Sequence, residues 1–221
     1  MEEFKMQYLS LFLTLVSGIA WTIVYISCIR TGFKEKTYCM PLFALGLNFA
    51  WEVIYSADEV IGLIGNPSLF SVQTIVNIIW ASLDAVIVYT YFKYGKKYFP
   101  ENAKKYFVPF SILTFATCVV LQLAYFFEFK GIPAAQYSAF VQNAAMSILF
   151  LIILYRRGST EGQNLTIAIA KWIGTLAPAL LMGIVQGFNI YIVLTGIVCS
   201  VFDLIYIVAL SNWKKQEKAI R

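Results

Sequence analysis

Apolar runs of about 20 residues, each long enough to cross a hydrocarbon core of roughly 30 Å as a helix, recur along the whole chain. Hydropathy marks seven such runs, and only short loops separate them. The runs cover approximately residues 7–29, 39–60, 72–93, 106–127, 134–155, 166–186 and 189–211. We therefore expect an all-α integral membrane protein, a seven-transmembrane helix bundle that forms one domain over residues 1–221.

Two further features bear on the internal order of this bundle. Ser82-Leu83-Asp84 in the third run resembles Val201-Phe202-Asp203 in the seventh, which is consistent with a 3+1+3 pseudo-repeat. Pro178 lies inside the sixth run. Because proline lacks an N–H group and its ring clashes with the preceding turn, we expect a kink there.

The basic residues gather on one side of the membrane when the loops are assigned to alternating sides. Lys171 lies near that side, and only Lys5 and Lys130 fall on the other. The positive-inside rule then places the N-terminus outside and the C-terminus in the cytoplasm, in a bacterial plasma membrane or the endoplasmic reticulum. Topology thus accounts for the net charge of +5, and no nucleic-acid partner is indicated. The side expected to be cytoplasmic holds Arg30, Lys34, Lys36, Lys93, Lys96, Lys97, Lys104, Lys105, Arg156, Arg157, Lys214, Lys215, Lys218 and Arg221.

The composition excludes several classes of site. The chain has no histidine, which excludes His-based metal hydrolases, His proton relays and Ser-His-Asp triads. No phosphate-binding glycine loop occurs. The four cysteines lack C-x-x-C spacing, so neither a zinc site nor a disulfide framework is indicated; they are Cys28, Cys39, Cys118 and Cys199. We expect no metal site and no cofactor.

Three acidic residues, Glu52, Asp84 and Asp203, lie deep inside the apolar runs. A carboxylate near the bilayer centre costs several kcal/mol, so it must face the interior of the bundle and is a functional candidate. Asp58 and Glu59 lie nearer the outer end of their run, where we expect water to solvate them.

Each deep acid shares a helical face with polar and aromatic residues, because these residues recur three, four and seven positions apart. The faces hold Asn48, Trp51, Glu52 and Tyr55 in the second run, Trp80 and Asp84 in the third, and Asp203 and Tyr206 in the seventh. Lipid cannot satisfy such side chains. They therefore predict a central cavity closed by aromatic rings.

Acids and aromatic rings together favour one kind of chemistry. Burial among aromatic rings disfavours the ionised form of a carboxyl group, which can then stay protonated and act as a general acid. Aromatic faces bind an isoprenoid chain and stabilise carbocations. These are the parts needed to protonate an epoxide or an alkene and to guide the cyclisation of a polyene.

Four short motifs, in order along the chain, carry a resemblance to a known family. They are Asn48-Phe49-Ala50-Trp51-Glu52, Trp80-Ala81-Ser82-Leu83-Asp84, Gln142-Asn143-Ala144-Ala145-Met146-Ser147 and Phe202-Asp203-Leu204-Ile205-Tyr206. The chain resembles the integral membrane terpene cyclases of meroterpenoid and indole-diterpene biosynthesis, which are similar in size and have seven spans.

The resemblance implies a metal-independent cyclase that protonates a terminal epoxide or alkene of a farnesyl- or geranylgeranyl-bearing substrate. By motif match, the two essential acids are Glu52 and Asp203, which we expect to act as a coupled pair. Asp84 could receive the closing proton. Trp51, Tyr55, Trp80 and Tyr206 would shape the chain and shield cations, and Asn48 and Asn143 would orient carboxyl groups or the polar head of the substrate.

A 3+1+3 small-solute transporter is the main alternative, because such carriers also have seven spans. A retinal-binding protein is disfavoured, since the seventh run has no lysine for a Schiff base. The sequence leaves open the substrate's chain length and head group, and the oligomeric state.

Overall fold

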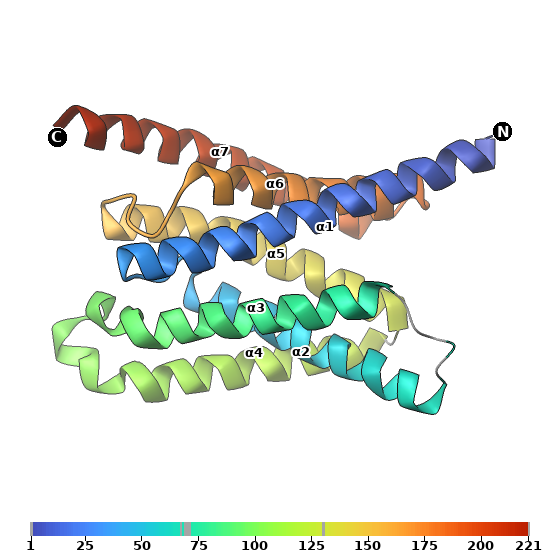
Figure 1. The fold of residues 1–221 in the computed structure, drawn as a ribbon, viewed down its shortest axis with the longest axis horizontal. Coiled ribbons are helices and arrows are strands. Elements are labelled where there is room, and N and C mark those ends of the chain that lie inside the picture. Colours follow the sequence, from blue (N-terminus) through green and yellow to red (C-terminus); the bar gives the residue numbers. More distant parts are fainter. Residues whose placement is uncertain (1, 67, 69–71, 130, 221) are drawn as a thin grey trace. The chain divides into compact units, whose positions relative to one another are not determined.

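The computed structural model describes residues 2–66, 68, 72–129 and 131–220, and in these ranges all regular secondary structure is helical (Figure 1). Lys130 and Arg221, two of the basic residues that were assigned to sides of the membrane, lie outside these residues. The long helices are α1 (Glu2–Glu35), α2 (Leu42–Gly65), α3 (Val72–Tyr94), α4 (Phe107–Phe129), α5 (Gly131–Arg157), α6 (Leu165–Leu180) and α7 (Ile190–Ile220). Two 3₁₀ turns, η2 (Gly95–Tyr98) and η3 (Glu101–Tyr106), join α3 to α4.

Each apolar run coincides with one long helix, so the all-α prediction is confirmed. The ends of α1 and α7 extend well beyond the predicted spans. At the end of α7 the sequence Lys214–Ala219 consists of Lys, Gln, Glu and Ala, which are good helix formers, so the helix continues after its apolar part has ended.

Within the described residues, six stretches are long and apolar enough to cross a membrane, which supports a multi-pass membrane protein. They are Phe4–Glu35, Thr74–Tyr98, Glu101–Phe129, Gly131–Arg157, Leu165–Val185 and Ile190–Ala219. Helix α2 is not among them because Glu52, Asp58 and Glu59 place three charged groups within its length. A seventh span over α2 stays a prediction.

The helices form two compact units, which are described separately. Unit 1 comprises the described residues up to Cys28 and those from Asn143 onward, and unit 2 comprises Ile29–Gln142. Helices α1 and α5 each contribute residues to both units. The single domain over 1–221 and the 3+1+3 pseudo-repeat stay predictions.

In unit 2, helix α2 packs against both α3 and α4. Its approach to α4 depends on Gly46, because a Cβ atom there would lie 2.8 Å from Sγ of Cys118. Leu47 and Ala50 pack around the same cysteine. Small residues at the crossing let two membrane helices come close enough for van der Waals contact along their backbones.

In unit 1, helices α6 and α7 make the corresponding close contact. A Cβ atom on Gly196 of α7 would lie 2.8 Å from Cβ of Ala179 on α6. Helix α1 joins them through Ser17, whose hydroxyl donates to the carbonyl oxygen of Gly174 at 2.8 Å. These contacts fix the interface between α6 and α7, called the seam below, where the buried charges of this unit lie.

Pro178 lies inside α6, and a π turn begins three residues after it, while a kink at the proline itself stays a prediction. Helix α6 ends at Leu180 and continues as η4 (Leu181–Val185), in which the backbone is wound more loosely. The N–H group of Leu181 contacts the carbonyl oxygens of both Ala177 and Pro178. Single π turns of this kind locally change the winding of a helix.

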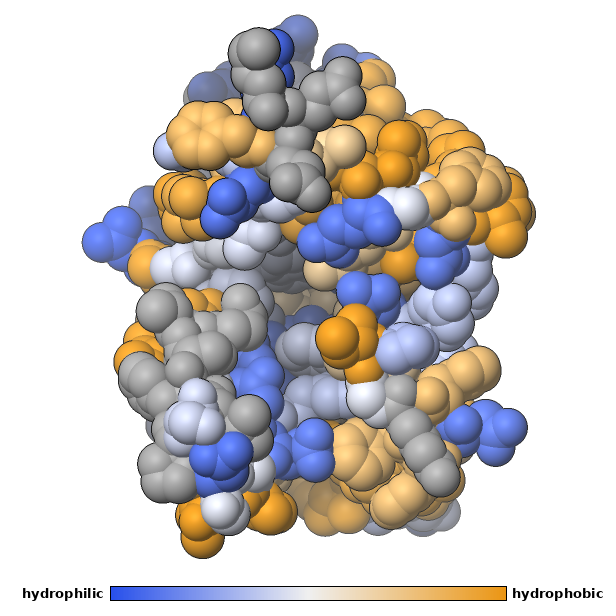
Figure 2. Space-filling model, turned by 90° about the vertical axis from the view of Figure 1, so that its right-hand side faces the viewer, coloured by the Kyte–Doolittle hydropathy of each residue, from blue (hydrophilic) through white to orange (hydrophobic). Residues whose placement is uncertain are grey.

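Large apolar side chains are exposed on several helices, as expected for surfaces that face lipid. Figure 2 looks onto the ends of the helices and shows blue, hydrophilic side chains among the orange, hydrophobic ones. Examples within the helices are Phe12 (61% exposed), Leu113 (65%) and Val120 (64%). A soluble protein would bury such residues, so this surface supports the membrane assignment.

Candidate functional site

In unit 2 the predicted face of α2 lies against the first half of α5. Trp51 donates from Nε1 to the carbonyl oxygen of Ala135 at 3.0 Å, and the hydroxyl of Tyr55 lies 3.4 Å from Oγ of Ser138. The ring centroids of Trp51 and Tyr55 are 4.9 Å apart. Glu52, on the same helix, is only 3% exposed. The sequence thus places a buried acid on a helix whose aromatic neighbours are held in fixed positions.

Asp84 of α3 lies at the end of a chain of amide side chains. Nε2 of Gln122 donates to Oε1 of Gln142 at 2.6 Å, and Nε2 of Gln142 donates to Oδ1 of Asn48 at 3.2 Å. Nδ2 of Asn48 then donates to Oδ2 of Asp84 at 2.6 Å. The chain links α4, α5, α2 and α3 and fixes one oxygen of a fully buried carboxyl group. Oδ1 of Asp84 has no hydrogen-bond partner among the described residues.

Glu59 corrects one expectation from the sequence. We expected water to solvate it, but its side chain is half-buried and accepts a hydrogen bond from Nδ2 of Asn77 at 2.9 Å. Asp58, the neighbouring acid, is exposed as expected. The difference follows from helical geometry, since adjacent residues point about 100° apart on a helix with 3.6 residues per turn.

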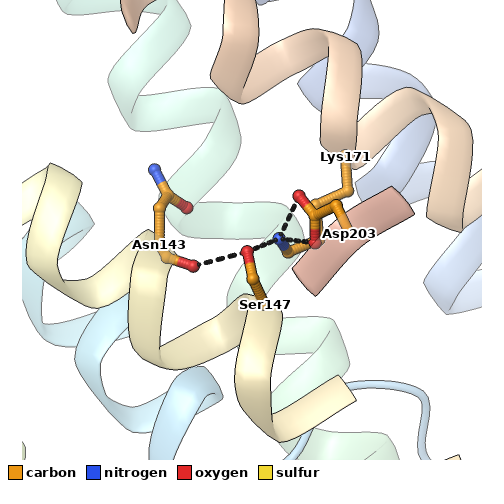
Figure 3. Close-up of polar contacts among 4 residues, drawn as sticks. All are labelled: Asn143, Ser147, Lys171 and Asp203. Carbon is orange, nitrogen blue, oxygen red and sulfur yellow. Dashed lines mark hydrogen bonds and ion pairs between the residues drawn. The ribbon is translucent and has the colours of Figure 1, made fainter. Parts of the chain in front are cut away.

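In unit 1 the carboxylate of Asp203 on α7 forms an ion pair with Lys171 on α6 (Figure 3). Nζ of Lys171 lies 2.8 Å from Oδ1 and 2.9 Å from Oδ2 of Asp203, and 2.6 Å from Oγ of Ser147 on α5. The ring of Phe150 lies 6.0 Å from the same nitrogen. Both charged side chains are buried. Water does not solvate these two charges, so they compensate each other.

Lys171 does not belong with the basic residues that set the topology. We placed it with the topological charges near the cytoplasmic side, but its side chain is fully buried and paired with Asp203. The sequence position of Lys171 already indicated a buried charge, because the residue lies inside the sixth apolar run. A buried cation there is as costly as a buried acid. A lysine so deep in an apolar run indicates a buried partner of opposite charge, although the sequence does not say which acid it is.

Tyr206 is held by contacts inside unit 1. Its hydroxyl donates to Oε1 of Gln163 at 3.0 Å, and its ring lies 5.6 Å from that of Phe150. Glu217 of α7 holds the same loop, accepting from the backbone N–H and the hydroxyl of Thr160. Tyr206 is fully buried, so these contacts account for its packing.

Asn143 and Trp80 are only partly buried. The backbone carbonyl oxygen of Asn143 accepts from Oγ of Ser147 at 2.9 Å, while the side chain of Asn143 points away from the ion pair (Figure 3). Its Oδ1 atom has no hydrogen-bond partner among the described residues. The side chain of Asn143 is thus not part of the hydrogen bonds that hold Asp203.

The predicted site residues fall into both units. Glu52 belongs to unit 2 and Asp203 to unit 1, so coupling between these two acids stays a prediction. Unit 2 holds Asn48, Trp51, Glu52, Tyr55, Trp80 and Asp84, and unit 1 holds Asn143, Asp203 and Tyr206.

Unit 1 also has an open groove of about 480 Å³ between α1 and α6. Its lining is apolar apart from Thr166 and includes Ile19, Ile23 and Ile169. No predicted site residue lines it. The groove therefore carries no acidic side chain.

Comparison with known proteins identifies the family. The profile of the Pyr4-like transmembrane terpene cyclases matches residues 2–216. The chain is 26% identical to terpene cyclase pyr4 of Aspergillus fumigatus over 218 residues, which cover 92% of this chain and 86% of that protein. It is 27% identical to terpene cyclase andB of Emericella variicolor, over 75% of this chain and 68% of that protein.

A shorter and stronger similarity links the chain to terpene cyclase ascF of Acremonium egyptiacum. The identity there is 40% over 78 residues, which cover 35% of this chain and 26% of that protein. No solved structure matches the chain. The resemblance that the four motifs suggested is confirmed by a match over nearly the whole length, and the protein belongs to the Pyr4-like transmembrane terpene cyclase family.

Proposed function

We propose that this protein is a metal-independent membrane terpene cyclase that starts the reaction by protonating a terminal epoxide or alkene of a prenylated, meroterpenoid-type substrate. Family membership supports the class of enzyme. The observation that carries the finer proposal is Glu52, a carboxyl group 3% exposed on a helix beside Trp51 and Tyr55. A carboxyl group withdrawn from water in this way suits proton donation.

Glu52 is the proton donor in this proposal. For an epoxide, its proton goes to the ring oxygen while the adjacent C–O bond breaks, which leaves a carbocation and the Glu52 carboxylate. For an alkene, the proton goes to one carbon of the double bond and the cation forms on the other. The next double bond of the chain then attacks the cation, and each attack forms one ring bond.

Aromatic side chains then guide the cation through cyclisation. In the proposal, the rings of Trp51, Tyr55, Trp80 and Tyr206 shield successive cations through their negative faces. The reaction ends when a carbon next to the last cation loses a proton. Asp84 is the proposed acceptor, supported by its buried Oδ1 atom, which has no partner in the described part of the chain. The product is an isomer of the substrate.

Asp203 is the second acid that the reaction requires in this proposal. Its pairing with Lys171 supports a role as a fixed negative charge and argues against direct proton donation, because both oxygens already face an ammonium group. Asn48 supports the reaction by orienting Asp84, and Asn143 would bind the polar head of the substrate.

The test is conversion of defined substrates by membranes that contain the protein. Farnesylated and geranylgeranylated aromatic acceptors, each with and without the terminal epoxide, would be incubated with wild-type membranes and with Glu52→Gln membranes. We expect the wild type to form isomers of unchanged mass that have lost double bonds, and the variant to form none. No conversion of any substrate would contradict the proposal.

The same assay in D₂O separates the two ways of starting the reaction. Protonation of an alkene leaves one deuterium on carbon, so the product gains one mass unit that washing with H₂O does not remove. Protonation of an epoxide leaves deuterium only on the new hydroxyl group, where it exchanges. The family match does not favour the transporter alternative. Uptake of a polar solute into proteoliposomes would revive it.

A further inference from the structure

Lys171 uses the full hydrogen-bonding capacity of its ammonium group inside unit 1. The group has three donors, and three oxygens lie within 2.9 Å of it, namely Oγ of Ser147 and both carboxylate oxygens of Asp203. Lysines that set topology reach toward water with their charged ends. This side chain has no exposed surface. Its charge is therefore committed to Asp203 and Ser147.

The contact with both oxygens fixes how the carboxylate is oriented, and the helices around it limit its movement. Lys171 and Ala179 lie on one side of α6, eight residues apart, and Asp203 and Gly196 lie seven residues apart on α7. The contact between Gly196 and Ala179 holds the backbones close at one point of the seam, and the ion pair holds them at another. Ser147 anchors the ammonium group from α5.

We infer that Lys171 is a positioning residue for the reaction: Ser147 holds its ammonium group, and the ammonium group holds the Asp203 carboxylate in its working orientation. The inference rests on the proposed function in assigning Asp203 to the reaction. A purely structural pair is a weaker explanation, because well-packed apolar residues stabilise a buried position as well as an ion pair does.

The first test is Ser147→Ala, which removes the anchor and leaves the ion pair itself intact. The matched control is Thr14→Val in α1, because the Thr14 hydroxyl makes the same kind of bond to the carbonyl oxygen four residues earlier, on an exposed face. We expect Ser147→Ala to lower kcat about tenfold or more with little change in KM, since small displacements of a charge that supports the reaction reduce rates strongly. Thr14→Val should match the wild type.

The second test reads the Asp203 carboxylate directly and needs no turnover. The chain has only three aspartates, Asp58, Asp84 and Asp203, so labelling with ¹³C-aspartate and subtracting the Asp203→Asn spectrum isolates one infrared carboxylate band. We expect this band to shift in Ser147→Ala and to shift further in Lys171→Met, and to stay unchanged in Thr14→Val. If Lys171→Met yields too little folded protein, the position of the Asp203 band in Ser147→Ala is by itself the test.

The inference requires both a lower kcat and a shifted Asp203 band in Ser147→Ala. An unchanged kcat in Ser147→Ala, or an unchanged Asp203 band, overturns the inference. If wild-type membranes convert no prenylated substrate, the proposed function fails first, and the assignment of Lys171 to a reaction fails with it. The infrared band would then still show whether Ser147 and Lys171 fix the Asp203 carboxylate, so the two failures can be told apart.

Discussion

Nζ of Lys171 lies 2.8 Å from Oδ1 and 2.9 Å from Oδ2 of Asp203, and neither side chain reaches the surface. Asp203, one of the two acids that the family motifs mark, thus faces a permanent cation. Glu52, the other, is 3% exposed on α2, the helix that also carries Trp51 and Tyr55. The pairing of Asp203 supports its proposed role as a fixed charge, and the proposal assigns proton donation to Glu52.

The ion pair predicts a specific pattern of stability. Removing one partner leaves a buried charge without compensation, so Asp203→Asn and Lys171→Met should each lower the free energy of unfolding by about 3–5 kcal/mol. The double variant Lys171→Met/Asp203→Asn should regain most of that loss, because neither charge remains. Thermal unfolding in detergent, followed by size-exclusion chromatography, measures the three variants. A double variant as unstable as the sum of the single variants would contradict the prediction.

Glu52→Gln should reduce turnover by about 10²-fold or more, because general acid catalysis contributes roughly 10²–10⁴-fold. The substitution keeps the size of the side chain, so the amount of folded protein should not change. Asp58→Asn on the same helix is the control, since Asp58 is exposed and lies outside the proposed site. Rates measured per folded molecule test the prediction, and wild-type turnover in Glu52→Gln would remove Glu52 from its role.

The amide chain that ends at Asp84 should depend on Asn48. Asn48→Ala leaves Oδ2 of Asp84 and Nε2 of Gln142 without this partner, and an unsatisfied buried polar group costs about 1–3 kcal/mol. We therefore expect a lower unfolding midpoint in detergent. Thr117→Val, which removes an exposed hydroxyl bond on α4, should leave the midpoint near the wild-type value. Equal midpoints for Asn48→Ala and the wild type would show that the chain adds no stability.

Gly46 should not tolerate a larger side chain. In Gly46→Ala the new methyl group would lie 2.8 Å from Sγ of Cys118, so either the Cys118 side chain must rotate or α2 and α4 must move apart. Overpacking of this kind costs about 1–3 kcal/mol. Cys118→Ala in the same chain removes the clashing sulfur and should restore part of the lost stability. If the double variant is no more stable than Gly46→Ala, the close contact is not the cause.

The sequence was sufficient for the helices and for the faces that carry the deep acids. Hydropathy sums over about 20 neighbouring residues, so it locates helices well, and the i, i+3, i+4 spacing placed Trp51 and Tyr55 beside Glu52. The sequence could not say which acid pairs with Lys171, or which amides form the chain that ends at Asp84. Lys171 and Asp203 are 32 residues apart, and Asn48 and Gln142 are 94 apart. Such pairings depend on how helices pack, which no local pattern records.

The positive-inside rule predicts that the N-terminus lies outside and the C-terminus in the cytoplasm. Exposed lysines near the two ends allow a direct test, namely Lys5→Cys and Lys218→Cys as separate variants. The native cysteines give little background, because Cys28, Cys39, Cys118 and Cys199 are all at most 1% exposed. With the protein expressed in a bacterial plasma membrane, a maleimide that cannot cross membranes should label Lys5→Cys in intact cells at once and Lys218→Cys only after permeabilisation. The reverse order of labelling would show that the chain is inserted the other way round.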